Sequence, residues 1–153
     1  MKIWLALFAL LAPAAASAAD NVSLTSKVLV ERVKPGPDGK TVTVREEPAM
    51  VTPGDKLIVL LSYRNRGAEP ATGFTLTNPI PASVAFTGSE DSSASVSVDG
   101  GKTWGPLASL KVTAADGASR PAVAADVTHI RWSLRQPIAA GAGGELSFRG
   151  IVE

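Results

Sequence analysis

Residues 51–82 carry the clearest structural information in the chain and read VTPGDKLIVLLSYRNRGAEPATGFTLTNPIPA. The pair Pro53-Gly54 places a fixed φ angle before a residue that tolerates a positive one, as a type II turn prefers. Residues 57–64 then have apolar side chains at both odd and even positions as far as Ser62, which predicts a strand in the centre of a sheet. Asn65-Arg66-Gly67 ends this strand and begins a turn.

The second half of the same segment predicts another strand, at residues 74–77, with Phe74 and Leu76 facing inward. The sequence Asn78-Pro-Ile-Pro81 follows it directly. Proline has no N–H to donate to a neighbouring strand, and it also restricts the backbone of the residue before it. The strand ladder is therefore expected to stop at this proline-rich sequence.

Outside this segment the apolar residues recur at every second position from Asp20 onward, without the three-and-four spacing of an amphipathic helix. The first strand is expected at 22–33 and has four apolar residues on one face, namely Val22, Leu24, Val28 and Val30. Pro35-Gly-Pro-Asp-Gly39 closes a hairpin into a strand at 41–45, because Asp-Gly suits the positive φ angles of such a turn.

Further strands are predicted at 84–87, 93–98, 107–113, 129–134 and 145–152, and the Ala-rich residues 114–125 are interpreted as a surface loop. Short strands separated by turn signals are typical of sandwiches. The predicted fold is therefore all-β, an immunoglobulin-like antiparallel β-sandwich of about seven to nine strands.

The first 19 residues are interpreted as a signal peptide, with Lys2 before an apolar run at 3–12 and cleavage before either Ala19 or Asp20. The apolar run is about half the ~20 residues that a membrane-spanning helix needs. We expect an exported chain of about 134 residues, in the periplasm, on the cell surface or outside the cell, with no integral membrane segment. Residues 20–49 are expected to form the N-terminal hairpin of one domain, and residues 50–153 its main part.

Charge and cysteine content narrow the classes of partner. Lys2 is one of 15 basic residues, so its removal leaves 14 against 14 acidic residues, and no nucleic-acid partner is expected. Five arginines alternate with apolar residues, as a basic groove for nucleic acid or acidic polysaccharide would require. They are better explained as the solvent-exposed face of a sheet, and they are Arg64, Arg66, Arg131, Arg135 and Arg149. The chain has no Cys, so apolar packing alone must hold an exported domain together.

Several short motifs occur in a recognisable order over roughly residues 50–152. They are the Pro-Gly-Asp turn, Tyr63-x-Asn65-x-Gly67, Pro70-Ala-Thr72, Asn78-Pro-Ile-Pro81, Trp132, Ile138-Ala-Ala-Gly141 and Leu146-Ser-Phe148. In this order the chain resembles the bacterial conserved-repeat family, domain of unknown function number eleven. The resemblance implies an immunoglobulin-like surface module without assigned catalysis. The family pattern usually has Asp where this chain has Asn78, and both side chains can cap a turn.

A second resemblance is to the Asp-box, S-x-D-x-G-x-T-W, which Ser97-Val-Asp-Gly-Gly-Lys-Thr-Trp104 matches. In sialidase-like propellers this box is a folding motif that lies away from the catalytic face. A propeller needs several blades of roughly 40 to 50 residues, for which this chain has neither repeats nor room. We therefore expect Asp99, Gly101, Thr103 and Trp104 to act structurally, with sugar binding as the weaker alternative.

No catalytic or cofactor site is predicted. His129 is the only histidine, its nearest acid is Asp126 on the opposite strand face, and a solvent-facing histidine is the simpler explanation. A loop Ca²⁺ site using Glu90, Asp91 or Asp99 stays open as an alternative. Trp132 and Phe148 are expected in the core rather than on a sugar-stacking platform. We expect no cofactor, no metal and no enzyme activity.

Two functional hypotheses follow. The first is a structural or adhesive module of the bacterial cell envelope that acts through protein–protein contacts, with donor-strand exchange by residues 22–30 or other self-association by strand addition as a variant. The second is a domain that binds an envelope glycan or another ligand through loops at one end, the candidates being 46–52, 88–93 and 114–125. The partner is expected to be another exported or envelope protein.

Overall fold

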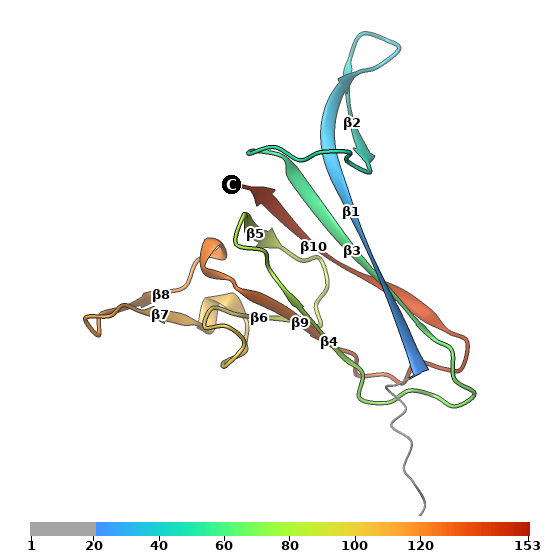
Figure 1. The fold of residues 1–153 in the computed structure, drawn as a ribbon, viewed down its shortest axis with the longest axis vertical. Helices are drawn as coiled ribbons and strands as arrows, with labels where there is room; N and C mark the ends of the chain where they lie inside the picture. The colour runs from blue at the N-terminus through green and yellow to red at the C-terminus, as the bar shows by residue number, and fades with distance from the viewer. Residues whose placement is uncertain (1–20) are drawn as a thin grey trace, which may run out of the picture.

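A computed structural model describes residues 21–153, and the predicted signal peptide lies outside these residues. The described chain is all-β with antiparallel strand pairing, which confirms the predicted class. None of its helices, in residues 21–153, has the length and apolar character needed to cross a membrane. Two hairpins, β1–β2 and β7–β8, project from the rest of the chain (Figure 1).

The larger sheet has five strands in the order β2-β1-β3-β10-β5. Their bounds are β1 Val22–Pro35, β2 Thr41–Glu46, β3 Lys56–Asn65, β5 Val84–Gly88 and β10 Gly143–Val152. The strand predicted at 57–64 is indeed central, with β1 on one side and β10 on the other. Consecutive residues of this strand point to opposite faces, and Leu57 and Ile58 are both buried, which fits apolar side chains on both faces.

The smaller sheet has three strands in the order β4-β9-β6. They are β4 Thr75–Pro79, β6 Ala94–Ser97 and β9 His129–Ser133. A separate two-stranded hairpin consists of β7 Lys111–Thr113 and β8 Ser119–Pro121. Two short 3-10 helices, η2 Leu107–Ser109 and η3 Ala124–Asp126, complete the described chain.

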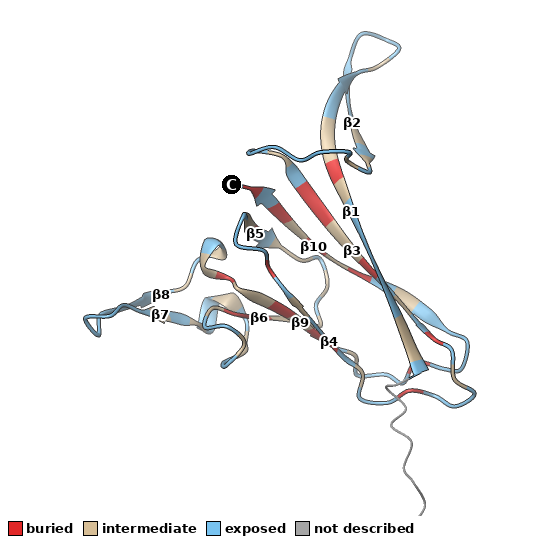
Figure 2. Ribbon diagram, viewed as in Figure 1, coloured by how far each residue is buried: buried red, intermediate tan, exposed pale blue. Residues whose placement is uncertain are grey.

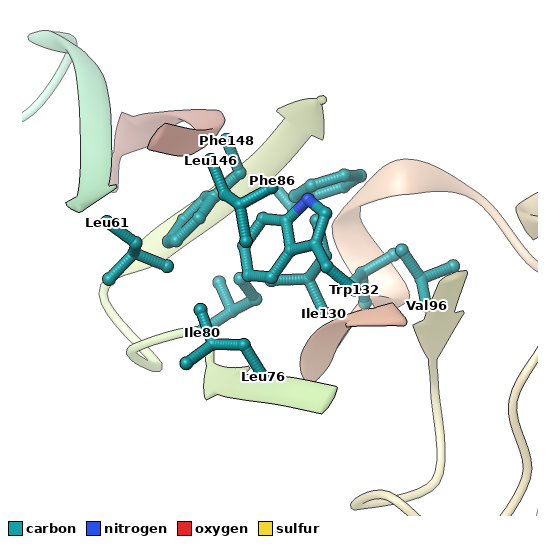
Figure 3. Packing of buried hydrophobic residues seen from close by; sticks show 10 residues of the cluster. Leu61, Leu76, Ile80, Phe86, Val96, Ile130, Trp132, Leu146 and Phe148 are labelled. Carbon is teal, nitrogen blue, oxygen red and sulfur yellow. The ribbon is translucent and has the colours of Figure 1, made fainter. Parts of the chain in front are cut away.

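Side chains of both sheets share one buried cluster (Figure 3). From the larger sheet it takes Leu61, Phe86, Leu146 and Phe148, and from the smaller sheet Leu76, Val96, Ile130 and Trp132. Trp132 and Phe148 are among the most buried side chains, so the prediction that both lie in the core is confirmed. In Figure 2 the buried segments concentrate in the central strands, while both hairpin tips are exposed.

The ladder does not stop at Asn78 as predicted, because β4 continues through Pro79, which pairs with His129. Proline is compatible with an edge strand when its missing N–H would have pointed away from the ladder. The even-numbered residues of β4 bond to β9, as the Leu134 N–H to Phe74 carbonyl bond shows. Pro79 is odd-numbered and lies on an edge strand, so its missing donor costs no hydrogen bond.

Two other predicted elements also differ. Residues 107–113 contain the helix η2 before a short β7, instead of one strand. Residues 114–125, predicted as a loop, contain β8 and the start of η3. A turn closes the β7–β8 hairpin with the Gly117 N–H bonded to the Ala114 carbonyl, and Gly117 has a positive φ of 85°. These short strands bring the total in residues 21–153 to ten, above the seven to nine predicted.

Candidate functional site

The turn at Ser97–Trp104, which resembles an Asp-box, is held by its own side chains. The Asp99 carboxylate accepts hydrogen bonds from the backbone N–H groups of Lys102 and Thr103 and from the Thr103 hydroxyl, at 2.6–3.0 Å. The buried Ser97 hydroxyl donates to Asp99 and accepts from the Gly101 N–H. The Trp104 indole N–H donates to the Gly101 carbonyl at 2.8 Å. The polar side-chain atoms of Ser97, Asp99, Thr103 and Trp104 thus hold the turn, as the structural interpretation predicted.

These bonds also lower the pKa of Asp99. The largest cause is the Thr103 hydroxyl, followed by the Thr103 backbone N–H and the Ser97 hydroxyl, all of which favour the ionised carboxylate. A general acid needs a proton near neutral pH, whereas this carboxylate has lost it. Asp99 is therefore suited to holding a turn and unsuited to proton donation.

Trp104 lies on the outer side of the three-stranded sheet with two residues of β9. The Arg131 guanidinium carbon is 3.7 Å from the centre of the indole ring, a cation–π arrangement, and Arg131 also donates to the Thr77 hydroxyl. The His129 ring meets the indole edge-on at 6.3 Å. The guanidinium thus occupies one face of the indole ring, which reduces its use as a stacking surface for a sugar.

His129 and Asp126 do not act on each other. The His129 Nδ1 atom lies 3.1 Å from the Thr128 hydroxyl, while Asp126 forms a two-pronged pair with Arg120, both N–O distances being 2.7 Å. Arg120 and the Val123 N–H lower the pKa of Asp126 to about 2. His129 and Arg131 are half-buried while Ile130 and Trp132 are fully buried, which matches the predicted alternation along this strand.

Each candidate Ca²⁺ ligand is bound to another group of the fold. Glu90 pairs with Arg149 across 3.0 Å, Asp91 accepts a hydrogen bond from the Ser93 hydroxyl, and Asp99 lies within the Asp-box. Among residues 21–153 no three His, Cys, Asp or Glu side chains come together in a way that could hold a metal ion.

The five arginines singled out in the sequence do not form one groove. Arg149 bridges Glu31 and Glu90, which lie 118 and 59 residues away in the sequence. Arg131 stacks on Trp104, whereas Arg64 and Arg66 lie beside Ser23 at one end of the larger sheet. Arg135 lines a different groove, described next.

An open groove with a volume of about 770 Å³ lies between the end of β9 and the loop after β5. Its polar lining includes Asp91, Ser92, Arg135 and Gln136, and Tyr63 contributes an aromatic ring. The predicted binding loop 88–93 contributes to this groove, whereas loop 46–52 lines a separate depression beside Arg32. The Tyr63 ring packs on Phe74 with their centres 5.7 Å apart, so it is part of the core edge as well.

The sheet face that carries the core is not covered along β1. Cross-strand pairing places Leu24 opposite Tyr63, Val28 opposite Val59 and Val30 opposite Leu57, which puts the three β1 side chains on the core face. Val30 is fully buried, but Leu24 is 46% and Val28 39% exposed. The shared face was predicted correctly, and the exposure of two of its residues was not.

The cause of this exposure is the width of the smaller sheet. Phe74, just before β4, packs on Tyr63 of β3, while Val96 of β6 lies beside Phe86 of β5. The three-stranded sheet therefore covers β3, β10 and β5, and its edge strand β4 ends the cover above β3. Residues Val22–Val28 of β1 lie beyond this edge.

Asn65 is a second residue whose role the sequence did not reveal, since an Asn before a turn is normally expected at the surface. It is fully buried, and its amide donates to the carbonyls of Glu69 and Ile138 while accepting from the Gly67 N–H. Asn65 thus ties the turn after β3 to the segment before β10, 73 residues later.

Comparison with protein-family models, with curated proteins and with solved structures finds no match to this chain.

Proposed function

We propose that this chain is a non-catalytic structural or adhesive module of the bacterial cell envelope, which is exported by its N-terminal segment and acts through protein–protein contacts. We further propose that its two sheets form a β-sandwich related to the immunoglobulin-like conserved-repeat domains. Shared core residues from both sheets support the sandwich, because packed sheets bury their facing side chains together.

The observation that carries the functional proposal is the uncovered apolar face of β1. Leu24 and Val28 lie on the same sheet face as the core, yet the smaller sheet leaves them in contact with solvent. Burying apolar side chains is the main favourable term in protein association. Two exposed apolar side chains beside an open strand are therefore best explained as part of a contact surface for protein.

The charged and polar side chains support a non-catalytic role, because they bond to one another within the fold. Asp99 and Asn65 hold turns, Asp126 pairs with Arg120, and Glu31 pairs with Arg149. Each of these side chains is satisfied by a neighbour in the fold, so each is explained by stability alone.

A photocrosslinking residue introduced in place of Leu24 in cells tests this proposal. We expect a covalent adduct with another protein chain in the envelope fraction, and no adduct when the same residue replaces Lys40, at the exposed turn of the β1–β2 hairpin. Absence of any adduct at residue 24, or recovery of the chain from the cytoplasm alone, would contradict the proposal.

A second candidate function is binding of an envelope glycan in the groove near Tyr63. Its favouring observation is a lining that combines an aromatic ring with the guanidinium of Arg135, the amide of Gln136 and the hydroxyl of Ser92. Glycan-array binding that is lost in Gln136→Ala and kept in Lys40→Ala would favour this function. A flat array with the wild-type chain would exclude the glycans displayed.

A further inference from the structure

Residues Val22–Val28 of β1 form an open sheet edge. The Arg66 N–H donates to the Asn21 carbonyl, so odd-numbered residues of this strand bond toward β3. The Gly36 N–H donates to the Lys40 carbonyl, so even-numbered residues bond toward β2. β2 reaches down only to the pair Val30–Glu46. Within residues 21–153, the backbone groups of the even-numbered residues from Val22 to Val28 therefore have no strand beside them.

Of the other outer edges, those of β6 and β5 are partly shielded, while β2 and β4 are edge strands of their sheets. Val96 of β6 exchanges two backbone hydrogen bonds with Gly105, at 2.9 and 3.1 Å, so the outer edge of the smaller sheet is bridged there. The strand β5 lies against the helix η3. The edge of β1 differs from these, because it is open over seven residues and has the exposed Leu24 and Val28 side chains on its core face. Open edges of this kind are templates for strand pairing.

We propose that a second copy of this chain occupies this edge, with the two β1 strands pairing antiparallel about a twofold axis at Thr25. The proposal rests on the proposed function and names the partner at the same surface. The axis position follows from the open length, since Thr25 is the centre of Val22–Val28. A register centred nearer the hairpin would push the first residues of the partner strand into the place that β2 holds beside Val30.

The seven residues are self-complementary in this register. Antiparallel pairing places Val22 opposite the partner's Val28 and Leu24 opposite the partner's Ser26, all on the core face. Leu24 then also lies diagonally across from the partner's Leu24, within reach of a long side chain. On the other face Thr25 meets the partner's Thr25, and Lys27 lies opposite the partner's Ser23. No two like charges are opposed, and the ion pair of Lys27 with Glu47 is kept.

The backbone complementarity is equally direct. The free N–H and C=O groups belong to even-numbered residues, and the register pairs even with even: Val22, Leu24, Ser26 and Val28 with the partner's Val28, Ser26, Leu24 and Val22. A twofold axis makes every such contact occur twice, as an isologous interface requires. The pairing joins the two five-stranded sheets into one sheet and covers the apolar side chains that the smaller sheet leaves open.

A cysteine scan of the full chain, expressed with its own N-terminal segment, tests the register, because the wild-type chain has no Cys. Non-hydrogen-bonded antiparallel partners have Cα atoms about 4.5 Å apart, within disulfide range. Thr25→Cys should therefore form a covalent dimer under mild oxidation. Lys27→Cys is the matched control, since the two introduced cysteines would be about four residues, or roughly 14 Å, apart along the strand.

Sedimentation velocity of variants without cysteine provides a second, independent measurement. The wild-type chain should show a monomer–dimer equilibrium that shifts with concentration, because one strand edge is smaller than a standard stable interface. Val28→Lys should abolish the dimer, whereas Val42→Lys should keep it, because Val42 is similarly exposed, at 41%, but lies on β2 outside the open edge.

A wild-type chain that stays monomeric at every concentration, or equal crosslinking of Thr25→Cys and Lys27→Cys, would overturn the proposal. The two proposals fail in different ways. If the purified chain is monomeric while the residue-24 adduct in cells contains a different protein, the self-pairing is wrong and the proposed function stands. If the dimer forms but the chain is found only in the cytoplasm, the self-pairing stands and the envelope function is wrong.

Discussion

Replacing Trp132 by Ala should destabilise the chain more than any other single truncation in the core. Trp132 is fully buried, and its ring lies 6.4 Å from that of Phe148 and next to the other residues of the shared cluster. A buried Trp removes roughly 250 Å² from water, worth about 6 kcal/mol at ~25 cal/mol per Å². Because this cluster contains side chains of both sheets, loss of Trp132 weakens the packing between them.

The indole N–H of Trp132 reduces this value, because within residues 21–153 it is buried without a hydrogen-bond partner. A buried unsatisfied donor costs about 1–3 kcal/mol, which the Ala variant recovers. The expected loss of unfolding free energy is therefore about 3–5 kcal/mol, in the range typical of Trp-to-Ala changes in cores. Urea denaturation followed at a fixed pH measures this loss through the shift in midpoint.

The variant Trp132→Phe separates the two contributions. It keeps an aromatic ring in the core and removes the unpartnered donor, so it should cost much less than Trp132→Ala. The matched variant Trp104→Phe instead removes a donor that bonds to the Gly101 carbonyl at 2.8 Å, so that carbonyl loses its partner. Our account would be refuted if Trp132→Ala cost less than about 1 kcal/mol, or if Trp132→Phe were as damaging as Trp132→Ala.

Three further predictions concern single positions. Asn65→Ala should cost about 1–3 kcal/mol of unfolding free energy in urea, because it removes the three hydrogen bonds of a buried amide and leaves the partly buried Gly67 N–H without its partner; an unchanged midpoint would contradict the role of the buried amide. The pKa of Asp126 is lowered from its usual 3.8 to about 2, so its stabilisation is present above about pH 4 and is lost as pH falls toward 2. Thermal melts should therefore show a smaller acid-induced decrease in Asp126→Asn and in Arg120→Gln than in wild type, and an identical decrease in all three would exclude this pair as a cause. Gly144→Ala should destabilise the chain, because the added Cβ would overlap the Tyr63 hydroxyl, and Tyr63→Phe should restore part of the loss; absence of rescue in the double variant would place the strain elsewhere.

The sequence was most informative where the interactions are local or periodic. The motif Ser97–Trp104 spans eight residues, so its turn could be predicted from the sequence, and its hydrogen bonds confirm the predicted structural role of these residues. The alternation at 129–134 correctly placed Ile130 and Trp132 inward. The prediction failed at Pro79 because a proline is excluded from a ladder only if its N–H would point to a neighbour. That direction depends on the position of β4 at the sheet edge, which the local sequence does not state.

The sequence by itself determined the all-β class, the central position of β3, the hairpin at 35–39 and the core positions of Trp132 and Phe148, because alternation and turn chemistry act over a few residues. Only the tertiary structure decided which neighbours each strand has. The pairing of Glu31 with Arg149, the burial of Asn65 and the open edge at Val22–Val28 all depend on segments that are distant in sequence. An apolar alternation shows which side chains share a face, but only the second sheet determines which of them it covers.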